Sequence, residues 1–267
     1  MKIPKILSSS LAILLASASS DAAIALYSEY HLGEAGSLAG PGKLPQDSSG
    51  NGLHYTGEVG GGSASVFTAG VTAPGSTAFL STADGPNQGW FADIYGGPLA
   101  QTPLQTDNFG FGIYVQAAAN SAATRADVFL LGEDNGAFGF SLDINGWAAG
   151  ANGVAYIGPV EGTGFTANTW VHLALIRSNG VATFYLDGVA QSNTYSGVPV
   201  HGEGHLSVEP NGTAFFDGFL DEARVVTFSE GTSNGEVLNA LMVPEPSTAF
   251  MAVLSGAAMM GLRRRRA

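Results

Sequence analysis

The stretch TWVHLALIRSNGVATFYLDG, residues 169–188, decides the fold class. Two apolar runs flank Ser178-Asn179-Gly180, and Asn-Gly accepts the positive φ angles that a tight hairpin turn requires. In the first run the side chains at even and at odd positions are both largely apolar. We therefore expect an antiparallel hairpin whose first strand is central in a sheet and covered on both faces.

Similar turn signals recur along the rest of the chain. Asn-Gly occurs seven times and Asp-Gly three times, and short apolar runs lie between these turns. The runs comprise residues 109–117, 126–131, 138–144, 170–176, 181–186 and 215–227. Short, regularly spaced strands predict an antiparallel all-β sandwich, with one short helix at most, at 235–241.

The composition supports strands and argues against one class of partner. Glycine makes up 38 of 267 residues and cysteine is absent, which excludes thiol catalysis and disulfide bonds. Between residues 23 and 243 there are 20 acidic and four basic residues, a difference of −16. Such a surface repels phosphate backbones, so nucleic-acid binding is not expected.

The N-terminus has the pattern of a secretory signal. Two lysines, at positions 2 and 5, precede an apolar run at 6–18, and small residues follow up to Ala22. This order is typical of an exported protein, so residues 1–22 are predicted to be a signal peptide. A buried helix of the domain is the alternative.

The C-terminus has a second export-related pattern. Pro244-Glu245-Pro246 precedes the uncharged run 247–262, and Arg263, Arg264, Arg265 and Arg266 follow. A helix of that length spans about 24 Å, and the arginines should keep its end in the cytoplasm. Residues 244–267 resemble the PEP-CTERM sorting signal, which implies an exosortase as processing partner and transient membrane anchoring. An ordinary tail anchor is the alternative.

The body, residues 23–243, resembles the laminin-G-like (concanavalin A-like lectin/glucanase) jelly-roll family. Three blocks carry the resemblance: the hairpin W-x-H-x-A…Y-x-D-G at 170–188, FDGFLDEARV at 216–225, and DSSGNG at 47–52 after a first strand at 27–32. The resemblance implies an antiparallel jelly-roll β-sandwich. Its implied role is a carbohydrate- or protein-binding or structural module at the cell surface or in an extracellular polysaccharide matrix.

We find no catalytic residues in the sequence. Glycoside hydrolysis needs two carboxylates about 5–9.5 Å apart on one cleft, and sandwich hydrolases carry them as E-x-D-x-x-E, which does not occur here. Glu133-Asp134 precedes a turn, and strand alternation predicts that Asp221 and Glu222 point to opposite faces. A polysaccharide hydrolase or lyase remains the alternative function.

Calcium is the only cofactor that we expect. By the resemblance, Asp47 and Asn51 of the opening turn and Asp221 of the closing strand would approach one another as oxygen ligands. Alternatively, Asp47 and Asn51 only shape the turn, and Asp221 pairs with Arg224 or caps a strand end. The sequence HGEGH at 201–205 is predicted to be an exposed loop rather than a metal motif, because its glycines disfavour a helix. His172 is predicted to be a core residue.

Exposed aromatic rings are the candidates for binding a polysaccharide or surface glycan. Trp90, Tyr95 and Trp147 lie in stretches rich in glycine and asparagine. They are candidate ligand-binding residues, with satellite cores as the alternative.

Overall fold

A computed structural model describes residues 24–60, 65–68, 73, 76–82, 89–92, 107–119, 126–131, 138–143, 146–151, 155–159, 166–196, 203–208 and 215–242. The predicted signal peptide, Tyr95, the Pro244-Glu245-Pro246 motif and the four arginines lie outside these ranges. Within them, no helix is long and apolar enough to cross a membrane.

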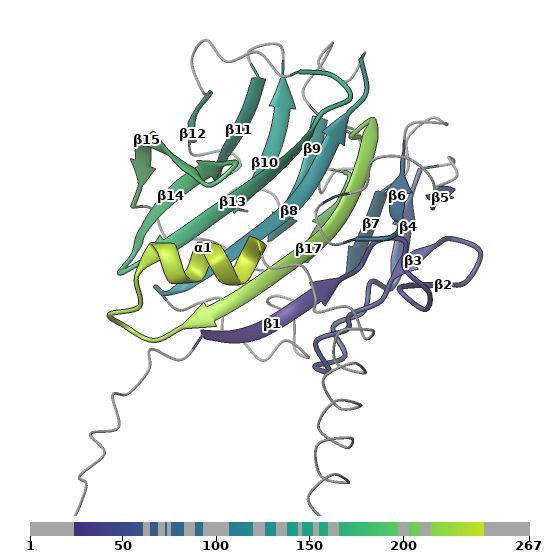
Figure 1. The fold of residues 1–267 in the computed structure, drawn as a ribbon, viewed down its shortest axis with the longest axis horizontal. Helices are drawn as coiled ribbons and strands as arrows, with labels where there is room; N and C mark the ends of the chain where they lie inside the picture. The colour runs from purple at the N-terminus through teal and green to yellow at the C-terminus, as the bar shows by residue number, and fades with distance from the viewer. Residues whose placement is uncertain are drawn as a thin grey trace, which may run out of the picture.

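The described residues form an antiparallel β-sandwich (Figure 1). The eight-stranded sheet has the order β15 (Val189–Tyr195), β14 (Val181–Leu186), β13 (Trp170–Ser178), β8 (Phe109–Ala117), β17 (Gly218–Phe228), β6 (Phe79–Ser81) and β5 (Ser65–Phe67), with β1 (Ile24–Tyr30) also paired to β17. The seven-stranded sheet has the order β12 (Ala155–Pro159), β11 (Gly146–Ala151), β10 (Phe138–Asp143), β9 (Ala126–Leu131), β16 (Gly204–Leu206), β7 (Gly89–Ala92) and β4 (Gly57–Val59). A small hairpin of β2 (Leu38–Ala39) and β3 (Leu44–Pro45) lies beside them.

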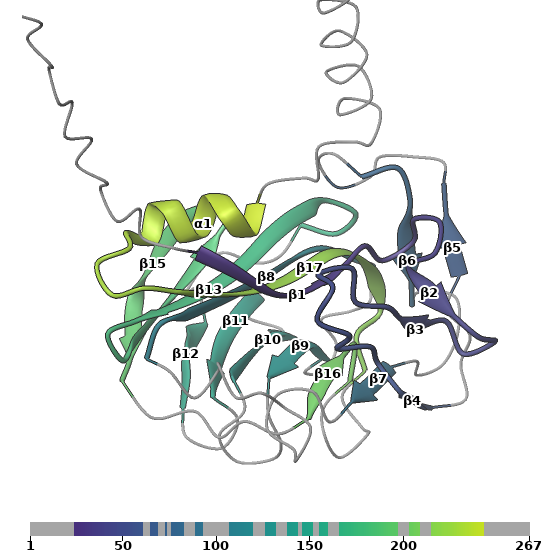
Figure 2. The same cartoon turned by 90° about the horizontal axis from the view of Figure 1, so that it is seen from below.

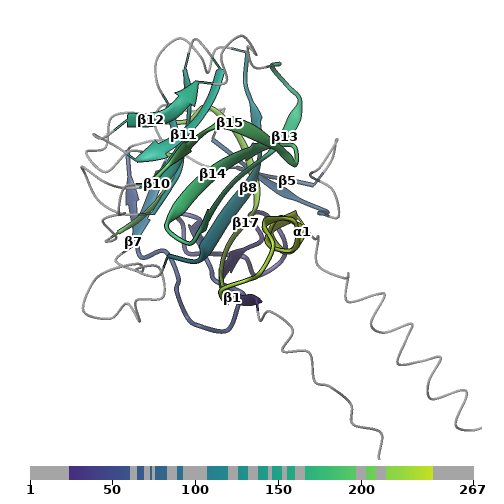
Figure 3. The ribbon, with the colours of Figure 1, turned by 90° about the vertical axis from the view of Figure 1, so that its left-hand side faces the viewer.

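The interior between the sheets combines aliphatic side chains with many aromatic rings. Phe111 of β8 packs on Phe129 and Phe140 of the opposite sheet, with ring centroids 5.6 and 4.7 Å apart. Figures 2 and 3 show these layers from two sides. The fold class predicted from the sequence, an antiparallel sandwich, is confirmed.

The hairpin at 169–188 is confirmed in detail. Asn179 and Gly180 take φ values of 49° and 78°, which the turn requires. β13 lies between β14 and β8, so it is a central strand. Its inner face contributes Leu173 and Leu175 to the main core, and its outer face packs under α1 (Asn234–Met242).

Helix α1 covers one end of the outer face of the eight-stranded sheet (Figures 1 and 2). Val237 and Leu241 are buried there, and a side chain at Gly110 would come within 3.0 Å of Val237. The helix begins with a capping box, in which Ser233 Oγ accepts from Glu236 N–H and Ser233 N–H donates to Glu236 Oε2. Tyr114 Oη donates to the carbonyl of Met242 at 3.2 Å, which fixes the other end.

Candidate functional site

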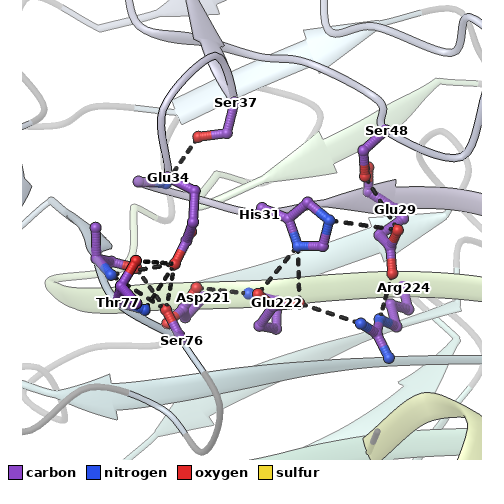
Figure 4. A network of polar contacts seen from close by, with 12 residues as sticks. Glu29, His31, Glu34, Ser37, Ser48, Ser76, Thr77, Asp221, Glu222 and Arg224 are labelled. Atoms are coloured by element: carbon purple, nitrogen blue, oxygen red, sulfur yellow. Dashed lines mark hydrogen bonds and ion pairs between the residues drawn. The ribbon is translucent and has the colours of Figure 1, made fainter. Parts of the chain in front are cut away.

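A buried polar network joins β1, the loop that follows it, and β17 (Figure 4). Its ionisable members are Glu29, His31, Glu34, Asp221, Glu222 and Arg224, and Ser48, Ser76 and Thr77 donate hydrogen bonds at its margins. Pairing of β1 with β17 places Glu29 opposite Arg224. The network falls into two parts, which share Glu222.

A β-bulge in β17 creates this arrangement. The register against β8 shifts between Asp221 and Arg224, and Glu222 adopts φ 47°. As a result, carboxylate oxygens of Asp221, Glu222 and Glu34 all lie within 4.8 Å of one another. The prediction that Asp221 and Glu222 point to opposite faces is therefore wrong, because a bulge interrupts the alternation of a regular strand.

The first part, here called the paired half, balances its charges internally. Arg224 Nε lies 2.7 Å from Glu29 Oε1, and Arg224 Nη2 lies 3.3 Å from Glu222 Oε2. His31 Nδ1 lies 3.0 Å from Glu222, and its Nε2 lies 3.4 Å from Glu29. Burial alone would lower the pKa of His31, but the hydrogen bonds to Glu222 and Glu29 outweigh it and raise the pKa to about 11. The imidazolium and the guanidinium thus compensate two carboxylates.

The same contacts stabilise the ionised form of Glu29. Burial would raise the pKa of its carboxyl, yet the hydrogen bond from His31 and the charge of Arg224 hold that pKa below its usual value. Its oxygens are already engaged by Arg224, His31 and Ser48. The paired half therefore offers a metal ion few free oxygens, although Glu29, His31 and Glu222 are close enough together to hold one.

The second part, here called the acidic pair, lacks such compensation. Glu34 Oε1 accepts hydrogen bonds from Ser76 Oγ, Thr77 N–H and Ala78 N–H at 2.7–3.1 Å. Asp221 is fully buried, and its Oδ1 accepts from the N–H of Glu222 at 2.9 Å. Among the described residues, Glu34 Oε2 and Asp221 Oδ2 have no hydrogen-bond partner. Burial raises the pKa of Asp221 to about 8; hydrogen bonding with Ser76 opposes this shift, and the charges of Glu34 and Glu222 add to it.

The acidic pair fits a hard divalent cation. Calcium prefers 6–8 oxygen ligands and commonly takes them from carboxylates. The orphaned, buried oxygens of Glu34 and Asp221 are ligands of that kind, and Glu222 lies alongside. Arg224 forms its ion pairs with Glu29 and Glu222.

Asp47 and Asn51, the other predicted calcium ligands, instead cover the edge of β1. Asp47 Oδ1 accepts from Glu29 N–H at 3.0 Å and Asn51 Nδ2 donates to the carbonyl of Tyr27 at 2.9 Å. The remaining oxygen of Asp47 accepts from Ser49 Oγ and Leu53 N–H. Hydrogen-bond donors thus occupy both Asp47 oxygens, and the structure brings Asp221 together with Glu34 rather than with Asp47. Asp47 and Asn51 therefore shape the turn, which was the alternative to calcium binding.

The predicted aromatic ligand-binding residues are core residues where the structure describes them. Trp90 in β7 is fully buried and Trp147 in β11 is 4% exposed. Both belong to the main interior cluster, and Trp90 Nε1 donates to the carbonyl of Gly42 at 2.9 Å. Because their rings are enclosed, neither can stack on a glycan, and this prediction is corrected for both. Tyr95 lies outside the described residues.

Two of the histidines that the structure describes are buried. His172 is 1% exposed and lies against Tyr114, with ring centroids 4.6 Å apart, as expected for a core histidine. His205, in contrast, belongs to β16 and is 2% exposed, so the exposed-loop prediction is wrong at its C-terminal end. Burial lowers the pKa of each to about 4.

Sequence reasoning missed Glu29, His31 and Glu34. The period of two in a strand places Glu29 and His31 on one face, and this was the available signal. Nothing in the spacing indicates that Glu34 meets Asp221, since the two are distant in sequence.

Comparisons with known proteins agree with this architecture. The family model described as the concanavalin A-like lectin/glucanases superfamily (Laminin_G_3) matches residues 93–229. No curated protein matches the sequence.

Solved structures resemble the fold at low identity. Domain 4 of AbnA, a GH43 extracellular arabinanase from Geobacillus stearothermophilus in complex with arabinotriose, is 15% identical with a TM-score of 0.56. That match covers 82% of this chain and 99% of the arabinanase domain. Trypanosoma rangeli sialidase in complex with sialic acid is 13% identical with a TM-score of 0.54, and the match covers 81% of this chain but only 32% of the sialidase. At such identities these two likenesses establish the fold alone.

Proposed function

This chain belongs to the concanavalin A-like lectin/glucanases superfamily, and we propose that its sandwich is a non-catalytic carbohydrate-binding module of an exported protein. One observation carries the proposal: the sandwich corresponds to 99% of an arabinanase domain that was solved with arabinotriose. A fold of this extent therefore serves in that enzyme as a whole domain beside a saccharide. Transfer of the role to this chain is an argument from fold.

The site chemistry supports binding over catalysis. Glu34 is partly exposed, but its neighbours Asp221 and Glu222 are only 0% and 5% exposed. A glycosidic bond in a polymer cannot approach such groups, whereas general acid catalysis requires direct contact with the leaving oxygen. The alternative is a hydrolase or lyase on the same sandwich.

A binding screen with the purified protein tests the proposal. We expect retention on at least one polysaccharide in a glycan array or pull-down, without release of reducing ends or unsaturated sugars. Retention with product release would establish the enzymatic alternative. No retention on any glycan would favour a protein-binding or purely structural role.

We also propose export and sorting, from the two terminal patterns. The signal sequence would direct translocation, the C-terminal helix would anchor the chain transiently in the membrane, and an exosortase would process it near Pro244-Glu245-Pro246. The intact mass of the protein recovered from the producing cell reports both cleavages. A full-length mass in the soluble cell interior would contradict this proposal.

Calcium is proposed as the ligand of the acidic pair, with Glu34 and Asp221 as carboxylate ligands and Glu222 beside them. The ion would link the loop after β1 to the closing strand and neutralise two buried carboxylates. Binding to the folded state alone stabilises by about 2.7 kcal/mol at a hundredfold excess over Kd. We expect calcium to raise the Tm of EDTA-treated protein by several degrees, and E34Q/D221N to remove the increase. If calcium left the Tm of the parent protein unchanged, a structural metal would be ruled out.

A further inference from the structure

One row of side chains on the outer face of the eight-stranded sheet combines aromatic rings with an amide. Trp170 of β13 pairs with Gln116 of β8, which in turn pairs with Phe219 of β17. Their neighbours Val115 and Leu220 point into the main core, so the three side chains of this aromatic row project outward. All three are partly exposed.

The rings of the row are held rigidly. Phe79 of β6 packs edge-to-face against both, at 5.5 Å from the Trp170 ring and 5.1 Å from the Phe219 ring. The Cα positions of Trp170 and Phe219 are two strand spacings apart, about 10 Å, with Gln116 on the strand between them, and the Phe79 ring bridges the two outer rings. Rings fixed in advance lose little conformational entropy when a ligand stacks on them.

Helix α1 stops short of the row. The helix contacts the sheet over Gly110, and its last carbonyl is held by Tyr114, one outward position before Gln116. Figure 1 shows α1 across one end of β13, β8 and β17. Trp170 is also the only tryptophan of the three in the chain that is not enclosed in the core.

We propose that the Trp170–Gln116–Phe219 row is the saccharide platform of this protein, and that its ligand is a neutral glycan. This inference rests on the proposed carbohydrate-binding function. Apolar sugar faces would stack on the two rings while hydroxyl groups bond the Gln116 amide. An apolar protein partner would instead bury that amide without a hydrogen bond, which is unfavourable.

Charge selects the class of glycan. The row contains no ionisable side chain. The body carries 20 acidic against four basic residues between positions 23 and 243. Uronate-rich or sulfated polymers would be repelled by this field, whereas an uncharged chain would not.

The test uses the purified full chain with arabinotriose and laminarin as neutral probes and polygalacturonate as the anionic probe. We expect binding of a neutral probe to shield Trp170 from iodide quenching of its fluorescence, and W170A or F219A to weaken that binding about tenfold or more. W170F should retain most of the affinity. V189A, which changes an exposed side chain on the edge strand β15, is the matched control. Circular dichroism and Tm verify that each variant folds.

The outcomes distinguish failure of the proposed platform from failure of the proposed carbohydrate-binding function. Neutral-glycan binding that W170A and F219A leave unchanged would overturn the platform but keep the carbohydrate-binding function. Preference for polygalacturonate would overturn the neutral class. Absence of binding to every probe, extended to a glycan array, would overturn both the platform and the proposed function.

Discussion

The two halves of the polar network stabilise their buried carboxylates in different ways. In the paired half, Arg224 and His31 supply two positive charges to Glu29 and Glu222 within hydrogen-bond distance. In the acidic pair, Glu34 and Asp221 retain oxygens without a partner, and the pKa of Asp221 rises to about 8. Buried carboxylates therefore persist in this fold either through protein cations or by holding a proton, and a bound cation would replace that proton.

The largest effect should follow from removing the guanidinium of the paired half. R224M would leave Glu29 and Glu222 buried with only His31, and breaking a buried ion pair typically costs about 3–5 kcal/mol. R177M is the matched control, because the partner of Arg177, Asp107, is 65% exposed and water can solvate it. Urea unfolding of both variants measures the difference. Equal losses would show that packing of the arginine stem, rather than charge compensation, sets the stability.

The second prediction concerns pH. Because the folded pKa of His31 is raised to about 11, its contribution is fully present below its ordinary pKa of 6.5 and is lost as pH rises toward 11. Glu29 behaves oppositely, since its lowered pKa gives a contribution that is lost only as pH falls below 4.5. We expect stability to decline above pH 6.5 by at most about 1.4 kcal/mol per pH unit from His31. H31Q should flatten that slope in a series of Tm measurements, and an unchanged slope would place its origin elsewhere.

The smallest effect should come from the acidic pair. Below pH 8 Asp221 holds a proton in the absence of a cation, so D221N replaces one neutral group with another of similar shape. We expect its free energy of unfolding in EDTA at pH 6 to stay within about 1 kcal/mol of the parent. A loss as large as that of R224M would show that Asp221 is charged and compensated, and the contrast between the halves would disappear.

The positions of several strands along the chain could be predicted, and the reasons are local. The predicted runs at 109–117, 126–131 and 181–186 coincide with β8, β9 and β14. Each has strong apolar content and a turn signal beside it. The strands that hold Trp90 and Trp147 escaped prediction, because glycine and asparagine around them resemble loops. Tertiary packing encloses both rings anyway.

The site was less predictable. Asp221 was identified, but its partners were assigned to the Asp47 turn, which uses its oxygens to cap the edge of β1. A single bulge at Glu222 changed which carboxylates face one another. Alternation rules apply only to unbroken strands, so they cannot anticipate such a shift.

Local chemistry by itself determined the all-β class, the hairpin at 169–188 and the acidic charge of the body, since turn residues and side-chain polarity act over a few positions. Only the tertiary structure decided which charges meet: Glu29, His31 and Glu34 come from one end of the chain and Asp221, Glu222 and Arg224 from the other. It also decided that Trp170, rather than Trp90 or Trp147, reaches the surface. Burial and long-range pairing depend on strand register across the whole sandwich, which short sequence patterns do not encode.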